Sequence, residues 1–148
     1  MQQLRLDHQF VEFMPNILQP GILYISMEYA TATHLCCCGC GEKVVTPFTP
    51  TDWSMTFNGY SVSLSPSIGN WNLPCRSHYV ISQGRVIGAN PWSDQRIAAE
   101  RLRDRAAKAA YYGSQQKPPR VSIPSDRSST HHQPRGLWQR ILHYLLRS

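Results

Sequence analysis

Two short stretches of this chain concentrate residues that bind metal ions. Residues 34–41 read HLCCCGCG, and residues 74–78 read PCRSH. Together they hold all five cysteines of the 148-residue chain and two of its histidines. Zinc in proteins is bound tetrahedrally by thiolate and imidazole groups, usually taken from two separate turns. The sequence therefore predicts a zinc site that joins these two stretches.

The ligand set stays open at this stage, because more candidates are present than the roughly four positions that zinc offers. We expect zinc to be bound by three sulfurs chosen from four of the cysteines, and by a histidine that either completes the set or replaces one sulfur. These candidates are Cys36, Cys38, Cys40, Cys75 and His78. At least one cysteine is surplus. Sites rich in thiolate are more often structural, whereas hydrolytic zinc keeps a position open for water, and the sequence does not choose between the two.

Polar side chains with the types needed for acyl transfer flank these ligands. A serine, a histidine base and an orienting carboxylate are the minimum set for that chemistry. Glu28, His34 and either Ser67 or Ser77 can form such a group if the fold gathers them. Each serine taken alone has a competing role in a turn or cap. The sequence contains neither a His-Glu-x-x-His metalloprotease motif nor the His-x-Glu of a nucleotide deaminase.

The elements that must position these residues are mainly strands. Apolar, β-rich runs predict strands at residues 22–27 and 43–48, and alternating runs at 53–57 and 60–64 predict a hairpin with a type I′ turn at Asn58-Gly59. A loop rich in turn formers is predicted at 66–74, and a second hairpin follows from 79–81 and 85–87, which are joined by residues 82–84. A helix should begin after the N-cap Ser93 and stop at Gly113. The predicted fold is mainly β (α+β): a small zinc-stapled β-hairpin domain with one packed helix and a tethered C-terminal amphipathic helix.

Composition divides the chain into four parts. Residues 1–20 form an N-terminal arm or loosely packed edge segment, and residues 21–113 form the zinc-stapled catalytic or binding domain. Residues 114–136 are rich in Gln, Pro, Ser, Arg and His, which predicts a flexible linker. Residues 137–148 predict a short basic amphipathic helix, which docks on a partner, on a membrane surface or on its own domain.

The charge balance gives less information about function. The chain carries 15 Lys+Arg against 9 Asp+Glu, and much of the excess lies in its last third. A solvated charged face explains this better than an anionic partner, and no basic run alternates with aromatic residues as in single-strand nucleic-acid binders. No apolar run approaches the length of a membrane span or of a signal peptide. Adjacent thiols and an odd cysteine count argue against disulfides, so we expect a soluble protein of the reducing cytoplasm.

The pattern also resembles a known family. The quoted cysteine stretches, the VVTP at 44–47, Trp53 and the SLSPSIGNW at 63–71 are similar to motifs of small bacterial domain-of-unknown-function proteins that are encoded in ubiquitin-like conjugation operons. Their operon neighbours are a ubiquitin-like protein, a ThiF-like activating enzyme and a conjugating-enzyme homologue, in a presumed antiphage setting. The resemblance covers about residues 23–105 and leaves out the tail from residue 114.

The resemblance implies a metal-bound peptidase or deconjugase that processes the ubiquitin-like protein, with a serine hydrolase mechanism near zinc as the preferred form. That protein and its conjugating machinery are the implied partners. It implies that Glu28, His34, Ser67, Ser77 and the predicted metal ligands occupy motif positions of the family. One rival interpretation is a non-catalytic zinc-stapled adaptor that binds the same machinery. Another is a metal-dependent nucleic-acid-binding factor, which only the basic tail favours.

Overall fold

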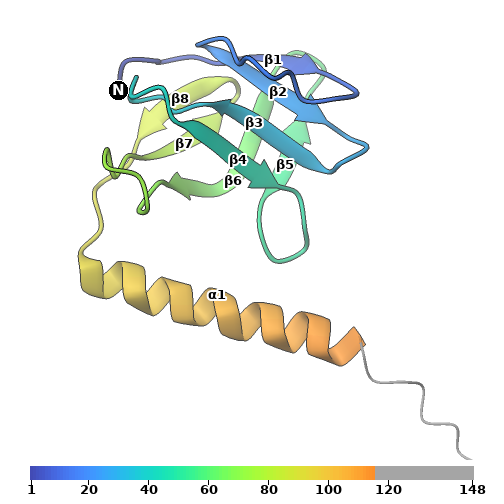
Figure 1. The fold of residues 1–148 in the computed structure, drawn as a ribbon. Helices are drawn as coiled ribbons and strands as arrows, with labels where there is room; N and C mark the ends of the chain where they lie inside the picture. Colours follow the sequence, from blue (N-terminus) through green and yellow to red (C-terminus); the bar gives the residue numbers. More distant parts are fainter. Residues whose placement is uncertain (116–148) are drawn as a thin grey trace, which may run out of the picture. The chain divides into compact units, whose positions relative to one another are not determined.

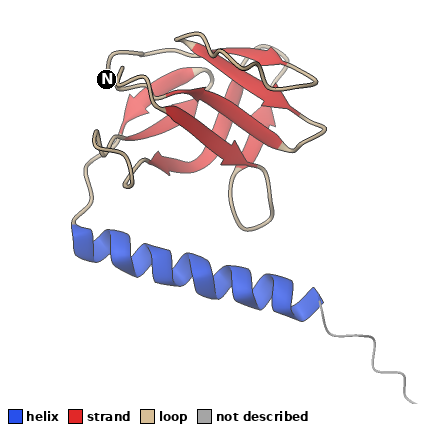
Figure 2. Cartoon of the chain, viewed as in Figure 1, coloured by secondary structure: helices blue, strands red, loops and turns tan. Residues whose placement is uncertain are grey.

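A computed structural model describes residues 1–115 of the chain (Figures 1 and 2). The predicted linker and terminal helix lie outside these residues, apart from the linker's first two positions. The described part is mainly β, as the sequence predicts. In chain order its elements are β1 (Asp7–Phe10), β2 (Ile22–Ser26), β3 (Thr31–Leu35), β4 (Lys43–Pro47), β5 (Ser54–Phe57), β6 (Val62–Gly69), β7 (His78–Ser82), β8 (Arg85–Gly88) and α1 (Asp94–Gln115).

The strands form two four-stranded sheets in which chain order is also spatial order. The first sheet runs β1-β2-β3-β4 and the second runs β5-β6-β7-β8. The pairings between these strands are antiparallel except for the parallel edge pair β1–β2. Figure 2 shows the strands of both sheets and the loops that join them. Sequential antiparallel strands can be joined by tight turns, which is why a chain with frequent Gly and Pro turns adopts this pairing.

One hydrophobic core is shared by the two sheets. Leu23 and Ile25 of β2 and Val44 of β4 belong to the same buried cluster as Leu64 of β6 and Ile81 of β7. β4 and the first half of β6 alternate buried and more exposed positions, and β2 is buried along most of its length, so one face of each sheet is removed from water. The two stretches that carry the candidate ligands, residues 34–41 and 74–78, are therefore held by a single core.

The N-terminal segment contributes to that core. Leu6 is only 3% exposed, and its N–H donates to the carbonyl of Gly84. The N–H of Val86 donates in turn to the carbonyl of Leu4. The segment expected to pack loosely thus connects β1 of the first sheet to β8 of the second.

Both predicted hairpins are present. The type I′ geometry predicted for the β5–β6 turn is found instead in the β7–β8 turn. Phe57 pairs with Val62, so Asn58-Gly59 lies in a four-residue connection in which Oδ1 of Asn58 accepts the N–H groups of Tyr60 and Ser61. Asn58 does not have a positive φ, which a type I′ turn requires. The β7–β8 turn is the one with two consecutive positive φ values.

That turn consists of Gln83 and Gly84, with φ of 51° and 73°. Ser82 pairs with Arg85 across it, so it is a two-residue connection. Positive φ at both central positions matches the right-handed twist of the strands that follow. The β7–β8 hairpin therefore has a tight closure that holds β7, the strand that carries His78.

The predicted loop at 66–74 is partly wrong, because β6 continues through Pro66 to Gly69. The register of β6 against β7 shifts between Leu64 and Ile68, which marks a bulge or irregularity at this point. A bulge redirects side chains and is often found beside active sites. Ser67 lies within this irregular segment, so its side chain is aimed by strand geometry and not by a free loop.

Helix α1 begins as predicted and ends later. Oγ of Ser93 accepts the N–H of Arg96, which is the N-cap interaction expected from the sequence. The helix passes through Gly113, the predicted stop, and reaches Gln115. Ile97 is its one buried residue in the described part of the chain, whereas Leu102 is 64% exposed. The predicted apolar stripe is therefore almost entirely solvated, and α1 is attached mainly by polar contacts.

Candidate active site and metal centre

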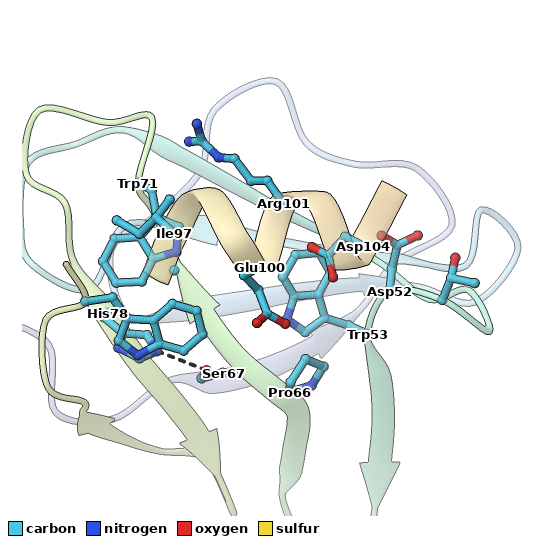
Figure 3. A pocket seen from close by; sticks show the side chains of 13 residues that line it. Asp52, Trp53, Pro66, Ser67, Trp71, His78, Ile97, Glu100, Arg101 and Asp104 are labelled. Carbon is cyan, nitrogen blue, oxygen red and sulfur yellow. Dashed lines mark hydrogen bonds between the residues drawn. The ribbon is translucent and has the colours of Figure 1, made fainter. Parts of the chain in front are cut away.

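Ser67 and His78 meet on one face of the second sheet. His78 pairs with Gly69 across the β6–β7 ladder, and Ser67 precedes Gly69 by two residues. Residues two apart on a strand share a face, so Ser67 is the diagonal neighbour of His78. The Oγ of Ser67 lies 3.0 Å from Nε2 of His78 (Figure 3). This is a hydrogen-bonded pair of hydroxyl and imidazole.

The other nitrogen of the His78 ring determines which way the proton can move. Nδ1 lies 2.7 Å from the main-chain carbonyl oxygen of Asn90. A carbonyl oxygen only accepts, so Nδ1 must donate its hydrogen to it. In the neutral ring Nε2 then carries the lone pair and accepts the hydroxyl proton of Ser67. Asn90 thus sets the tautomer in which His78 acts as a base toward Ser67.

Two indole rings hold the imidazole in place. The ring centroids of Trp71 and Trp92 lie 5.0 and 5.2 Å from that of His78, and the two indoles stack on each other at 5.5 Å. The indole of Trp71 packs directly on Gly69, because a Cβ added there would lie 2.4 Å from its Nε1. Only glycine leaves room for the ring at this position.

A cavity of about 190 Å³ opens beside the pair. Ser67, His78, Trp53 and Trp71 line it from the β domain, and α1 closes another side (Figure 3). Ser67 is half-buried and faces this space. A hydroxyl with a base at one end of a concave, partly aromatic cavity is a suitable place for a substrate to bind.

The sulfurs of four cysteines form a separate cluster. The Sγ atoms of Cys36, Cys38, Cys40 and Cys75 all lie within 4.8 Å of one another. Individual separations are 3.4 Å for Cys36–Cys38 and 3.9 Å for Cys36–Cys75. Sulfurs bound tetrahedrally to zinc at about 2.3 Å lie about 3.8 Å apart. The donor set and its spacing therefore fit a metal ion of the zinc type.

The cluster connects two segments that are far apart in the sequence. Cys36, Cys38 and Cys40 follow β3, whereas Cys75 lies in the turn before β7. A complete set of four thiolates leaves no position for water in a tetrahedral site, which is the pattern of structural zinc. His78, expected as an alternative ligand, lies three residues after Cys75 and contacts Ser67 instead.

Ser77 faces the sulfur cluster. Its Oγ lies 3.1 Å from Sγ of Cys36, and Nδ2 of Asn70 donates to it at 2.9 Å. Sγ of Cys75 also lies 3.5 Å from this hydroxyl. Although burial acts in the opposite direction, hydrogen bonds from the side chain and backbone of Ser77 and from the side chains of Cys38 and Cys40 lower the pKa of Cys75 to about 7, which favours the thiolate that binds metal. Ser77 is thus arranged to orient and stabilise the sulfurs.

The two remaining residues of the expected catalytic group lie elsewhere. Nε2 of His34 forms a 2.8 Å hydrogen bond with the hydroxyl of Tyr79, and its Nδ1 has no partner among the described residues. Burial lowers the pKa of His34 to about 4. Glu28 lies in the exposed turn between β2 and β3. Within residues 1–115 neither residue is hydrogen-bonded to a serine, because His34 is buried against the hydroxyl of Tyr79 and Glu28 lies on the surface.

The fifth cysteine is the surplus one. Cys37 is fully buried in the hydrophobic core, and burial raises its pKa to about 12. It is not part of the group of four. As a thiol it packs as a small apolar side chain.

Sequence reasoning assigned His78 to the metal and did not identify Asn90, Trp71 or Trp92 as site residues. The order Cys-x-x-His made a shared ligand set plausible, whereas the start of β7 at His78 separates the two side chains. The Ser67–His78 contact could have been predicted only from the β6–β7 register. The contact of His78 with the main-chain carbonyl of Asn90 could not be predicted from residue types, because every residue has such a carbonyl.

The serine hydroxyl, the oriented imidazole and the adjoining cavity are the features of a serine-hydrolase type of site, supported by a nearby thiolate cluster. The family model described as BubE, bacterial ubiquitination-like system serine protease, matches residues 10–89, which is more than half of the chain. The chain belongs to this family. No curated protein and no solved structure matches it significantly. In the described part of the chain, no helix combines the length and apolarity needed to cross a membrane.

Proposed function

We propose that the protein is a serine peptidase that processes a ubiquitin-like protein, with Ser67 as nucleophile and His78 as general base. The observation that carries this proposal is the 3.0 Å contact between Oγ of Ser67 and Nε2 of His78, with Nδ1 engaged by the carbonyl of Asn90. Membership in a family of serine proteases supports the reaction type.

The reaction follows from the proton positions. Oγ of Ser67 attacks the carbonyl carbon of the C-terminal amide of the ubiquitin-like protein while its proton passes to Nε2 of His78. The tetrahedral intermediate collapses, the C–N bond breaks, and His78 returns the proton to the leaving amine. Water then attacks the Ser67 ester with His78 again as base, which releases the carboxylate and restores the hydroxyl.

The carbonyl of Asn90 has the role of the carboxylate in a three-membered group. It holds the tautomer and orientation of the His78 ring through the 2.7 Å contact. It carries no full charge, and the indole rings of Trp71 and Trp92, whose centroids lie about equally close, hold the ring in place. This division of roles explains why the proposed site needs neither Glu28 nor His34.

We further propose that Cys36, Cys38, Cys40 and Cys75 bind zinc. Bound zinc would cross-link the segment after β3 to the turn before β7 and neutralise thiolate charge. Cys75 lies only three residues before His78, so fixing this turn fixes the start of the strand that carries the base. The thiols of the cluster support a reducing compartment, which is why we place the protein in the cytoplasm.

The pathway is proposed from the family. Its description supports ubiquitin-like machinery as partner, and the resemblance to operon-encoded proteins supports antiphage defence and deconjugation as the setting. The rival adaptor function predicts binding to the same machinery without cleavage. A cleavage assay therefore separates the two functions.

The test is to incubate the purified protein with the precursor and with conjugates of the ubiquitin-like protein from the same system, and to follow cleavage by intact mass. Wild type should cleave at the C-terminus of the ubiquitin-like part, and Ser67→Ala should not. Ser77→Ala is the matched control and should retain cleavage when loaded with zinc. Cleavage by Ser67→Ala, or binding without any cleavage by wild type, would refute the proposed peptidase.

A further inference from the structure

The β6–β7 ladder carries different side chains on its two faces where it approaches the sulfur cluster. Gly69 pairs with His78 at the end of the ladder. One step further, the main-chain N–H of Asn70 donates to the carbonyl of Ser77 at 2.8 Å. Side chains alternate between the faces of a sheet, so Asn70 and Ser77 lie on the face opposite to His78. The proposed base and the side chain of Asn70 are therefore on opposite sides of the same two strands.

The side-chain amide of Asn70 reaches three hydrogen-bond acceptors on that face. Its Nδ2 lies 2.9 Å from Oγ of Ser77, 3.4 Å from the hydroxyl oxygen of Tyr79 and 3.6 Å from Sγ of Cys36. The amino group of an amide has two hydrogens, so one of them is shared between two of these acceptors. A single half-buried side chain thus joins the end of β6 to β7 and to the segment after β3.

The orientation of this amide follows from the sulfur that it faces. A thiolate only accepts hydrogen bonds and repels the carbonyl end of an amide, so the amino end of Asn70 must point toward Cys36. Oγ of Ser77 accepts from the same amino group at 2.9 Å, which leaves its own hydrogen for a sulfur. Sγ of Cys36 lies 3.1 Å and Sγ of Cys75 lies 3.5 Å from this hydroxyl oxygen. Asn70 therefore donates to the cluster directly and also through Ser77.

Asn70 also closes the loop that carries one of the sulfurs. Its main-chain and side-chain contacts with Ser77 join the two ends of this loop. Cys75 lies inside the loop, and so does Trp71, whose indole packs against His78 on the other face. Because Trp71 directly follows Asn70 in the chain, the position of the indole depends on how firmly Asn70 is held. The sulfur cluster and the packing of the proposed base are thus connected through this one residue.

We propose that Asn70 is a positioning residue of the zinc centre, which donates hydrogen bonds to its thiolates and so fixes the cluster on the strand pair that carries Ser67 and His78. The inference rests on the proposed zinc site and extends it beyond its four ligands. Hydrogen bonds to a coordinating group orient it and moderate its charge, and loss of such a partner typically lowers metal affinity by about 10–100-fold. Because Asn70 lies on the face opposite to His78, it acts through the sulfurs and not on the reacting atoms.

Zinc affinity measures the strength of this support. The 148-residue protein and its variants are titrated with Zn²⁺ in competition with a chromophoric chelator. Asn70→Asp keeps the shape of the side chain but replaces the amino group by a carboxylate oxygen, so it should weaken zinc binding by at least about tenfold. Asn72→Asp is the matched control, because it adds the same charge to the same loop at an exposed position and keeps the Oδ1 that accepts from Arg101. It should bind zinc like the wild type.

Cobalt distinguishes a hydrogen-bond donor from a residue that only supports the fold. In a tetrahedral thiolate site the d–d bands of Co²⁺ report the geometry, and the thiolate-to-cobalt charge-transfer band reports the electron density on sulfur. Loss of an N–H donor should move the charge-transfer band of Asn70→Asp to lower energy while the d–d bands keep their tetrahedral pattern. Asn70→Ala removes the same donor without adding a charge, so its band should move in the same direction.

Three results would overturn the inference and leave the zinc site in place. These are wild-type affinity and charge-transfer energy in both Asn70 variants, a loss of affinity without a shift of the charge-transfer band, and an equal loss in Asn72→Asp. If Asn70→Asp does not fold, Asn70→Ala decides alone, since alanine brings no charge into this half-buried position.

Failure of the underlying proposals is seen in different measurements. A wild type that binds neither Zn²⁺ nor Co²⁺ would refute the zinc centre, and this inference with it. A fluorophosphonate probe should label wild-type Ser67, as located by peptide mass mapping. Absence of labelling would refute the nucleophile assignment, whereas the effect of Asn70 on the metal would stand.

Discussion

Ser67 and His78 are diagonal neighbours on adjacent strands, and Oγ of the serine lies 3.0 Å from Nε2 of the histidine. The same short segment that carries His78 carries Cys75 of the sulfur cluster. The proposed base and the proposed metal centre are thus joined by the chain and not by a shared ligand. A variant can therefore remove a ligand of the metal without removing the base, or the reverse.

The choice of base is tested by paired histidine variants. His78→Gln should lower kcat by about 10³-fold or more, because the hydroxyl of Ser67 then has no group to take its proton. His34→Gln should leave kcat within about threefold and should lower the free energy of unfolding by about 1–3 kcal/mol, because a buried hydrogen-bonded ring is replaced. Steady-state cleavage and urea unfolding measure the two effects. The opposite pattern would return the role of base to His34.

The packing of the imidazole is tested at Gly69. Alanine there places Cβ about where the Trp71 ring lies, at 2.4 Å from Nε1, so the indole must move away from His78. We expect kcat/KM to fall about tenfold, with a loss of about 1–3 kcal/mol in unfolding free energy. Gly113→Ala is the control, because nothing lies within 4 Å of its added Cβ and it should keep full activity. Unchanged cleavage by Gly69→Ala would show that the indole does not position His78.

The metal centre is tested by its stoichiometry. The purified protein should contain about one zinc per chain by elemental analysis, and serine at Cys36 or Cys75 should remove it. Cys37→Ala should retain the zinc, because its sulfur lies in the core and outside the cluster. A metal-free wild type after purification under reducing conditions, or loss of zinc in Cys37→Ala, would contradict the proposed ligand set.

The attachment of α1 should depend on pH through one ion pair. Burial opposes ionisation of Asp52, but hydrogen bonds from Lys108 and Thr49 overcome it and lower its pKa. A folded-state pKa below the unfolded value of about 3.9 stabilises the folded state above that pH, and the contribution is lost as pH falls through the folded pKa. The contribution should be below about 1 kcal/mol because Lys108 is 43% exposed.

Hydrogen exchange of the α1 amides measures this attachment. Protection should be constant between about pH 5 and 8 after correction for intrinsic rates and should decrease below about pH 4. Asp52→Asn should lower protection at neutral pH and remove the acid-dependent part. The same pH dependence in wild type and in Asp52→Asn would exclude this ion pair as the cause.

Much of the β architecture follows from local patterns. Alternating apolar residues and Gly or Pro turns predict the strands β2, β4, β5, β7 and β8, since each is a response to nearby residues. The N-cap at Ser93 is local in the same sense. The concentration of cysteines likewise predicts a sulfur cluster, because few other arrangements use thiols in this way.

The catalytic partners depend on what is not local. Whether His78 faces a sulfur or a serine depends on the register of β7 against β6, and whether His34 reaches a serine depends on which side chain packs against it across the core, where it meets the hydroxyl of Tyr79. A shift of one residue moves every side chain to the opposite face of a sheet, so sequence spacing alone does not determine either contact. Residue types alone determined that this chain carries thiolate ligands and hydrolytic side chains. Only the pairing of strands and the placement of α1 decided which of them meet, because those contacts join positions distant along the chain.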